Sequence, residues 1–309
     1  MVATLRRRRP RRLFAAACAG LLAAQLALVP LGVRGWPPAS WQVVACDVGQ
    51  GDALVLRTGG ADVLVDTGPD PDRVSGCLAD LGVHRLALVV LTYLHADHVE
   101  GLPGVLRRVQ VREIEIGPLL EPSQEWTRVR GWAAEAHVPV SRAWRGERRA
   151  VGDASWEVLG PVAVLHGTDS DPNNSSLVMR VQLPALSLLL TGDAEQPEQE
   201  QVRGLAALRV DVLKVPHHGS DRQDPAFLAS TGARVALTSV GAGNPYGHPS
   251  PRVLAALRRA GVAVFRTDED GSVAVLRRHG TLTVVPRRAR RAAPPTAGTG
   301  RRDRAPPGT

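Results

Sequence analysis

The sequence predicts an α/β (α+β) fold in which two β-sheets pack together and helices cover them. The chain has 309 residues, of which 44% are hydrophobic, so it can bury a large core. Short apolar segments of strand type recur along it, some alternating and some continuously apolar, and segments with helical spacing lie between them. Strands with helices interspersed favour layered sheets with helices on the outside.

The predicted domain begins after a short proline-rich linker at residues 34–40. Three short strands are expected at 41–47, 53–57 and 62–66, because the glycine turns GQGD and TGG separate them. A helix is predicted over 71–82, where Gly82 ends it, and the apolar run 86–92 has the composition of a buried strand. This run leads directly into YLHADH, which therefore follows the C-terminal end of a strand.

The rest of the domain repeats the same two patterns. Further strands are predicted at 112–117, 156–160, 176–183, 186–193, 210–217, 233–240, 262–267 and 273–278. Further helices are predicted at 125–136, 195–207 and 251–260.

The chain carries a formal net charge of +8, and its basic residues gather at the two ends. Residues 1–36 hold seven arginines and no acidic residue, and residues 287–309 hold seven arginines and one aspartate. Without these two segments, residues 37–286 carry a net charge of −5. The basic composition is therefore not evidence that the folded domain binds nucleic acid.

The N-terminal segment predicts export of the domain. Residues 1–12 form a basic leader, and residues 13–33 form an apolar run of about the 20 residues needed to span a bilayer. The positive-inside rule holds the leader in the cytoplasm, so one transmembrane helix would place the domain on the extracytoplasmic side of the cell membrane. A cleaved secretory signal and a twin-arginine signal, suggested by RRLF, are alternatives that also export the domain. The Arg-, Pro-, Gly- and Ala-rich tail 287–309 is expected to be disordered.

Cysteine is sparse and excludes a cysteine-rich metal site. Of the three cysteines, Cys18 lies in the apolar run, which leaves Cys46 and Cys77 as either a disulfide pair in an oxidising compartment or two buried free thiols. Any metal must therefore use histidine and carboxylate ligands.

Histidines and aspartates follow four of the predicted strands. Loops at strand ends are where a rigid scaffold presents functional side chains. The spacing H-x-D-H in YLHADH holds three such groups close together, and distant Asp and His residues can complete the shell that zinc or manganese requires. The residues concerned are Asp66, then His95, Asp97 and His98, then Asp193, and finally His217 and His218.

The motifs DVGQGDA, LVDTG, HADHVEGLPG, NNSSLV, LTGD, VPHHGS and YGHP, in this order, resemble the metallo-β-lactamase-fold domain of the ComEC family of bacterial DNA-uptake proteins. The resemblance runs from about Trp41 to about Arg278 and implies an αββα sandwich, here at 41–286, with a metal site at the edge of the two sheets. In the family this domain normally follows the last helices of a multi-span channel. Only one apolar run precedes it in this chain, so the resemblance implies either a split or truncated member, or a domain that works beside a separate competence channel protein.

The resemblance also assigns roles to residues. The superfamily pattern HxHxDH falls on Tyr93, His95, Asp97 and His98, so a tyrosine stands where a histidine is expected. The implied metal ligands are His95, Asp97, His98, Asp193 and His217, with one ion firmly held and a second weakened by Tyr93. Asp66 would fix a ligand histidine.

Further side chains complete the expected site. The expected catalytic residues are Asp97, His218 and His248, the two histidines contacting the scissile phosphate or protonating the leaving oxygen. Asn173, Asn174 and Ser175 would contact phosphate or cap a strand turn.

The function that the ComEC resemblance implies is that of a divalent-metal hydrolase, a nuclease that degrades the non-transported DNA strand during DNA uptake. Two alternatives stay open. Tyr93 could leave a degenerate domain that only binds DNA or a channel partner. The same ligand set could also serve hydrolysis of another phosphoester or of a lactone, because fold and metal site alone do not fix the substrate.

Overall fold

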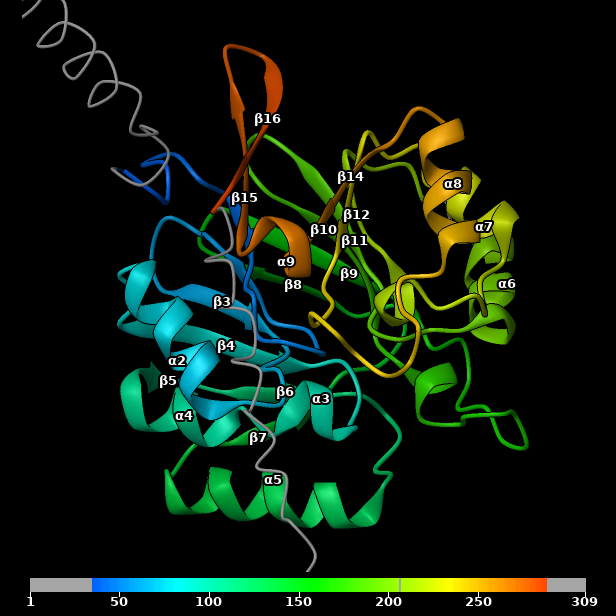
Figure 1. The fold of residues 1–309 in the computed structure, drawn as a ribbon. Coiled ribbons are helices and arrows are strands. Elements are labelled where there is room, and N and C mark those ends of the chain that lie inside the picture. The colour runs from blue at the N-terminus through cyan, green and yellow to red at the C-terminus, as the bar shows by residue number, and fades with distance from the viewer. Residues whose placement is uncertain (1–34, 206, 288–309) are drawn as a thin grey trace, which may run out of the picture.

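The computed structural model describes residues 35–205 and 207–287, which form two β-sheets packed face to face with helices on both outer faces (Figure 1). Sheet A has nine strands in the order β16 (Thr281–Pro286), β15 (Val273–Arg278), β1 (Val43–Ala45), β2 (Leu54–Leu56), β3 (Asp62–Val65), β4 (Arg85–Leu91), β6 (Ile114–Ile116) and β7 (Val140–Arg142), with β5 (Gln110–Val111) also paired to β4. Sheet B has seven strands in the order β14 (Ala263–Arg266), β13 (Val235–Thr238), β12 (Val212–Lys214), β11 (Ser187–Leu190), β10 (Val178–Gln182), β9 (Ala154–Gly160) and β8 (Arg148–Val151).

Helices from the two halves of the chain cover opposite faces of the sandwich. The outer face of sheet A packs against α2 (Pro71–Asp80), α4 (Leu102–Arg108) and α5 (Ser123–Glu135). The outer face of sheet B packs against α6 (Gln196–Leu205), α7 (Pro225–Ser230) and α8 (Pro251–Arg259). The short elements α3 (Ala96–Val99), α9 (Thr267–Asp270), η1 (Asn173–Ser175) and η2 (Pro216–Gly219) lie in connections between strands.

Side chains on alternating faces of the strands fill three hydrophobic layers. In β3, Val63 and Val65 point into the layer between the sheets, whereas Leu64 points into the layer beneath α2 and α4. The central strands are therefore buried on both faces, which explains why they are continuously apolar in sequence. Layers of helix, sheet, sheet and helix confirm the predicted sandwich.

The parallel strands bring the polar strand ends to one edge of the sandwich. Strands β3 and β4 run parallel in sheet A, and β11 and β12 run parallel in sheet B. The segments after these four strands carry Asp66, the YLHADH turn, Asp193 and the two histidines of VPHHGS. Functional side chains from both sheets thus meet at the carboxyl ends of central strands.

The structure differs from the sequence prediction mainly at the edge strands of the sheets and at the ends of individual elements. Strands β7, β8 and β16 were not predicted, because polar residues interrupt β7 and β8, and β16 follows a short turn after β15. The predicted strand 186–193 ends at Leu190, since the residues after it form the turn that presents Asp193. Helix α6 begins at Gln196 and ends at Leu205, shorter than predicted.

The predicted leader, the predicted anchor at 13–33 and the tail from residue 288 lie outside the described residues. Across residues 35–205 and 207–287, none of the helices has the length and apolar character needed to cross a bilayer.

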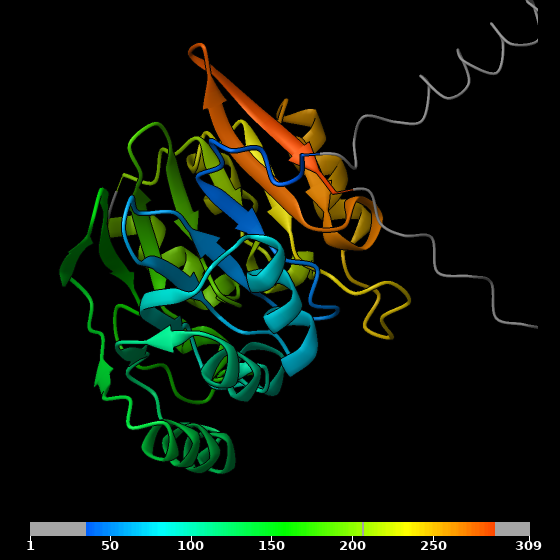
Figure 2. The same cartoon turned by 90° about the vertical axis from the view of Figure 1, so that its left-hand side faces the viewer.

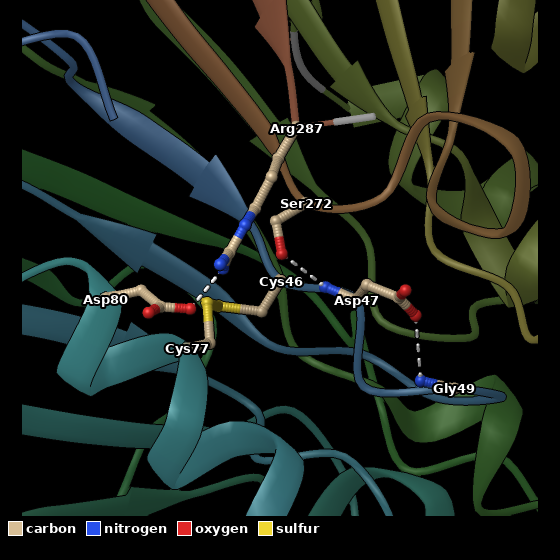
Figure 3. The surroundings of a disulfide bond; sticks show 7 residues. All are labelled: Cys46, Asp47, Gly49, Cys77, Asp80, Ser272 and Arg287. Carbon is tan, nitrogen blue, oxygen red and sulfur yellow. Dashed lines mark hydrogen bonds and ion pairs between the residues drawn. A yellow bond between two sulfur atoms is a disulfide. The ribbon is translucent and has the colours of Figure 1, made fainter. Parts of the chain in front are cut away.

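A disulfide joins the end of β1 to α2. Cys46 and Cys77 are bonded with their Cα atoms 6.0 Å apart, which decides between the two sequence alternatives in favour of a pair (Figure 3). The bond closes a loop of 31 residues in sequence separation, and a loop of that length stabilises a fold by roughly 3–4 kcal/mol through its effect on the unfolded chain. Next to it, Arg287 at the end of β16 pairs with Asp80 of α2.

Candidate metal centre

Asp66 orients one histidine of the YLHADH turn. It is fully buried in a left-handed backbone conformation (φ 58°), and its carboxylate accepts hydrogen bonds from the backbone N–H and the hydroxyl of Thr92, both at 2.8 Å. His98 Nδ1 lies 2.9 Å from Asp66 Oδ2. A carboxylate on Nδ1 fixes the ring so that Nε2 points away from Asp66, toward the other side chains of the site.

Four side chains converge around His98 Nε2. The ligand atoms of Asp97, His98, Asp193 and His218 all lie within 4.8 Å of one another. His98 Nε2 is 3.3 Å from Asp193 Oδ1, and both atoms are buried without a hydrogen-bond partner in the described structure. His218 Nε2 is 3.1 Å from Asp97 Oδ2 and 3.4 Å from Asp193 Oδ2.

This donor set fits a divalent cation. Two imidazole nitrogens and two carboxylate oxygens are the ligands that zinc accepts in a four-coordinate shell, and manganese accepts them as well. The two partnerless buried atoms, His98 Nε2 and Asp193 Oδ1, are what an ion between them would satisfy. Burial alone would lower the pKa of His98, but Asp193, Asp66 and Asp97 outweigh it and raise that pKa well above its usual range, which reflects a strongly negative field.

The two histidines of VPHHGS exchange the positions expected for them. His218 Nδ1 donates to the Ser239 carbonyl at 2.9 Å, which leaves Nε2 facing Asp97 and Asp193. His217, the predicted ligand, is absent from the four-residue cluster of the described structure, and its Nε2 lies 3.8 Å from Asp193 Oδ2. The cause is the backbone, because both residues adopt left-handed conformations (φ 46° and 51°) that the sequence does not signal.

His217 instead lies against Glu195, a residue that sequence reasoning missed. His217 Nδ1 is 3.1 Å from Glu195 Oε1, and the side chain of His217 is 19% exposed. Glu195 also accepts hydrogen bonds from the amides of Asn173 and Asn174, at 3.1 and 3.4 Å, and from Arg222 at 3.3 Å.

The predicted phosphate contacts Asn173, Asn174 and Ser175 are therefore buried, with protein partners of their own. The asparagine amides bind Glu195, and Ser175 Oγ accepts a hydrogen bond from the Leu165 backbone N–H at 3.2 Å. Their place in the structure is that of a support for the Glu195 and His217 pair.

Tyr93 points at the centre rather than away from it. Its hydroxyl donates to Asp193 Oδ2 at 2.7 Å, and the side chain is 3% exposed. Burial, reinforced by the Asp193 charge, raises the pKa of Tyr93 well above its usual range, so the group remains a neutral phenol. His95 lies beside it, with the two ring centroids 4.8 Å apart.

The residues around Tyr93 and His95 do not fit a second ion. The described part of the chain places no three-ligand group that includes His95. A phenol that donates a hydrogen bond to Asp193 is a poor ligand, and it occupies the oxygen that a second ion would share. The predicted weakness of this half of the site therefore has a geometric basis.

A buried ion pair that the sequence analysis did not predict lies next to the histidine–aspartate cluster. Lys214, the only lysine of the chain, is buried, forms an ion pair with Asp52 and donates to the Gly192 carbonyl at 3.0 Å. Its Nζ lies 3.7 Å from Asp193 Oδ1. Burial would raise the pKa of Asp52, but Lys214 and His218 outweigh it and hold that pKa at about 2. The signal in the sequence was a lone lysine within the apolar strand VDVLKVP.

His248 lies at the rim of the histidine–aspartate cluster, beside His217 and His218. Its ring centroid is 5.1 Å from that of His217 and 6.5 Å from that of His218. Burial, and then the two neighbouring histidines, lower the pKa of His248 to about 4, so its imidazole is neutral at physiological pH. It can hydrogen bond to a substrate oxygen there, but a neutral ring does not act as a strong proton donor.

The fold and the histidine–aspartate cluster define a metallo-β-lactamase-type metal centre. Residues 46–224 match the family model described as "Metallo-beta-lactamase superfamily". The chain is 31% identical over 274 residues to "ComE operon protein 3" of Bacillus subtilis, covering 79% of this chain and 34% of the relative. It is 29% identical over 276 residues to "Competence protein ComA" of Neisseria gonorrhoeae, covering 81% of this chain and 37% of the relative.

A solved structure agrees on the fold. The metallo-beta-lactamase fold protein YhfI from Bacillus subtilis superposes with a TM-score of 0.51 at 12% identity, covering 78% of this chain and 98% of the other. The chain spans about a third of the length of the curated relatives it matches. It belongs to the metallo-β-lactamase superfamily, as a domain of the ComEC family related to the competence proteins.

Proposed function

We propose that this domain is a metal-dependent phosphodiesterase that hydrolyses DNA, acting on the strand that is not transported during DNA uptake. The observation that carries the proposal is the convergence of Asp97, His98, Asp193 and His218, with two buried ligand atoms left without partners. A divalent ion held by these residues would lower the pKa of a bound water toward ~7 and polarise a phosphoryl oxygen.

The chain's own residues supply orientation and proton transfer. Asp66 and the Ser239 carbonyl fix the rings of His98 and His218 through their Nδ1 atoms. Asp97, whose side chain is 31% exposed, marks the side from which a substrate reaches the cluster. His217 lies between Glu195 and Asp193 and is partly exposed, so its Nε2 is positioned for proton exchange with a reacting oxygen. His248, neutral at the rim, is placed to donate a hydrogen bond to a phosphate oxygen.

Tyr93 limits the proposed site to one metal ion. With its phenol bonded to Asp193 Oδ2, the site offers a complete shell for one ion only. Two-metal hydrolases use the second ion to stabilise the attacking and leaving oxygens, so the proposed enzyme is a slow nuclease.

The proposed location is the extracytoplasmic side of the cell membrane, anchored by the apolar run 13–33. The Cys46–Cys77 disulfide supports this, because disulfides persist in oxidising compartments and are rare in the bacterial cytosol. A separate competence channel protein is the proposed partner, because the chain is similar to proteins named for competence. Protease added to intact cells should digest the domain, and protection of the domain would reverse this topology.

The activity is tested on the purified full chain in detergent. Bound metal per chain is measured beside cleavage of single-stranded DNA, of a short phosphodiester and of a lactone, with Asp193→Asn as the inactive control. Metal-dependent DNA cleavage lost in Asp193→Asn supports the proposal. Cleavage of the lactone alone would make the domain a different hydrolase, and DNA binding without any cleavage would make it a binding module weakened by Tyr93.

A further inference from the structure

An exposed tyrosine stands at the mouth of the metal centre. Tyr246 lies in the segment between β13 and α8 and is 68% exposed, and it and Trp144 are the exposed large hydrophobic side chains of the described residues. In Figure 2 this yellow segment projects from the body of the domain. The sequence motif YGHP that contains Tyr246 has no role in the mechanism above beyond His248.

Aromatic rings run from Tyr246 to the metal ligands. The Tyr246 and His248 rings are stacked, with centroids 5.9 Å apart and planes inclined by 28°. His248 in turn is stacked on the ligand His218, with centroids 6.5 Å apart and planes inclined by 30°. The Tyr246, His248 and His218 rings are thus successive neighbours between solvent and the cluster, and Tyr246 is the exposed end.

The segment that carries Tyr246 is held in one shape. The side chain of Asn244 donates to the carbonyls of Gly241 and His248, at 3.0 and 2.7 Å, and accepts from the backbone N–H groups of Tyr246 and His248, both at 3.2 Å. Gly241 N donates to the Gln50 side chain at 3.2 Å, which ties the segment to the turn after β1. An aromatic ring on a rigid support loses little conformational entropy when it binds a ligand.

The segment that carries Tyr246 has no negative charge that would oppose a phosphate-bearing ligand. Residues 241–250, GAGNPYGHPS, contain no acidic side chain, so nothing on the segment itself repels a phosphate chain. A planar, exposed aromatic ring beside the proposed phosphodiesterase site is the arrangement with which proteins hold bases of single-stranded nucleic acid, because every base has a π-face.

We propose that the exposed face of Tyr246 stacks against a nucleobase of a single-stranded nucleic acid whose phosphodiester lies at the Asp97–His98–Asp193–His218 cluster. This inference rests on the proposed function, and it deepens it by assigning to Tyr246 the residue contact that holds a base of the strand. Stacking holds the strand in register and does not take part in bond breaking, so Tyr246 is a positioning residue. Its loss should weaken strand binding and leave the chemical step intact.

The test compares two strands that differ only in their bases. A single-stranded oligonucleotide and an abasic oligonucleotide of equal length are given to the full chain and to Tyr246→Ala, Tyr246→Phe and Trp144→Ala. Cleavage kinetics are measured with metal at one fixed salt concentration, and binding is measured by fluorescence anisotropy after chelation, when no cleavage occurs.

Tyr246→Ala should raise KM and Kd for the base-bearing strand roughly tenfold with kcat unchanged, because one base stack is lost. Tyr246→Phe should keep normal values, and the abasic strand should not respond. Trp144→Ala, which removes the other exposed large hydrophobic side chain of the described residues, two positions after edge strand β7, should change the values for neither strand. Absence of the KM effect, an equal effect on the abasic strand, an equal loss in Tyr246→Phe, or an equal loss in Trp144→Ala would each overturn the inference. If no variant or wild-type chain cleaves either strand, the proposed function fails, and the anisotropy comparison still decides whether Tyr246 holds a base.

Discussion

The hydroxyl of Tyr93 donates a 2.7 Å hydrogen bond to Oδ2 of Asp193, the carboxylate that also faces His98 and His218. A phenol therefore fills the position from which a second ligand histidine would act. Because burial keeps this phenol neutral, it removes a ligand and at the same time engages a shared oxygen. The proposal that the domain holds one ion rests on this contact.

Tyr93→His should raise the bound metal from one ion toward two per chain and raise DNA cleavage roughly tenfold or more, since a neutral imidazole is the commonest metal ligand and a second ion supplies transition-state stabilisation. Tyr93→Phe is the matched control, because it frees Asp193 Oδ2 without adding a ligand. Metal content by elemental analysis and cleavage rate are measured on all three proteins. An unchanged metal content and an unchanged cleavage rate in Tyr93→His would contradict the proposal that Tyr93 prevents binding of a second ion.

The same metal-content and cleavage assays distinguish the role of His217 from that of His218. His218→Ala should lose most of the bound metal, because His218 Nε2 faces Asp97 and Asp193 at 3.1 and 3.4 Å. His217→Ala should keep the metal and lower kcat by about 10²- to 10⁴-fold, the usual contribution of a positioned acid or base. The reverse pattern, with metal lost only in His217→Ala, would restore the assignment expected from the sequence.

Much of this architecture and the identity of the site-bearing segments could be predicted from the sequence. Apolar strands that end in LVDTG, YLHADH, LTGD and VPHHGS mark where Asp66, His98, Asp193 and His218 lie, since loops after strands carry such groups. What pattern reasoning missed depends on three-dimensional contacts. The left-handed turn at His217 and His218 decides which ring faces the cluster, and Glu195 takes up the asparagine amides that were expected to bind phosphate.

Lys214 should be essential for stability. Lys214→Met leaves the Asp52 carboxylate buried without its partner, and breaking a buried ion pair in this way costs about 3–5 kcal/mol. The double variant Asp52→Asn with Lys214→Met removes both charges and should be less destabilised than the sum of the single variants. Urea unfolding of the four proteins in a chelating buffer measures this coupling. Strictly additive effects would mean that the two groups do not stabilise one another.

Glu198 of α6 should make the folded domain less stable as the pH rises. Its side chain is 1% exposed, and neither carboxyl oxygen has a hydrogen-bond partner among the described residues. Burial therefore raises the pKa of Glu198 well above its ordinary value. The folded protein holds this proton more tightly than the unfolded chain does. Its contribution to stability is complete below pH ~4.5 and is lost as the pH rises toward the folded pKa, at up to ~1.4 kcal/mol per pH unit.

Glu198→Gln keeps the shape and the acceptor oxygen but cannot ionise. The variant should match the wild type near pH 4 and exceed its free energy of unfolding by roughly 1–3 kcal/mol near pH 7, because only the wild-type unfolded chain gains stability by losing the proton. Glu200→Gln, on the exposed side of the same helix, is the control for removing one negative charge and should show no such divergence. Urea unfolding at a series of pH values gives the difference between variant and wild type, in which the pH dependence of the metal ligands cancels. A difference that stays constant from pH 4 to pH 8 would mean that Glu198 is ionised in the folded domain, and a helix-buried carboxylate would then need a partner that the present contacts do not provide.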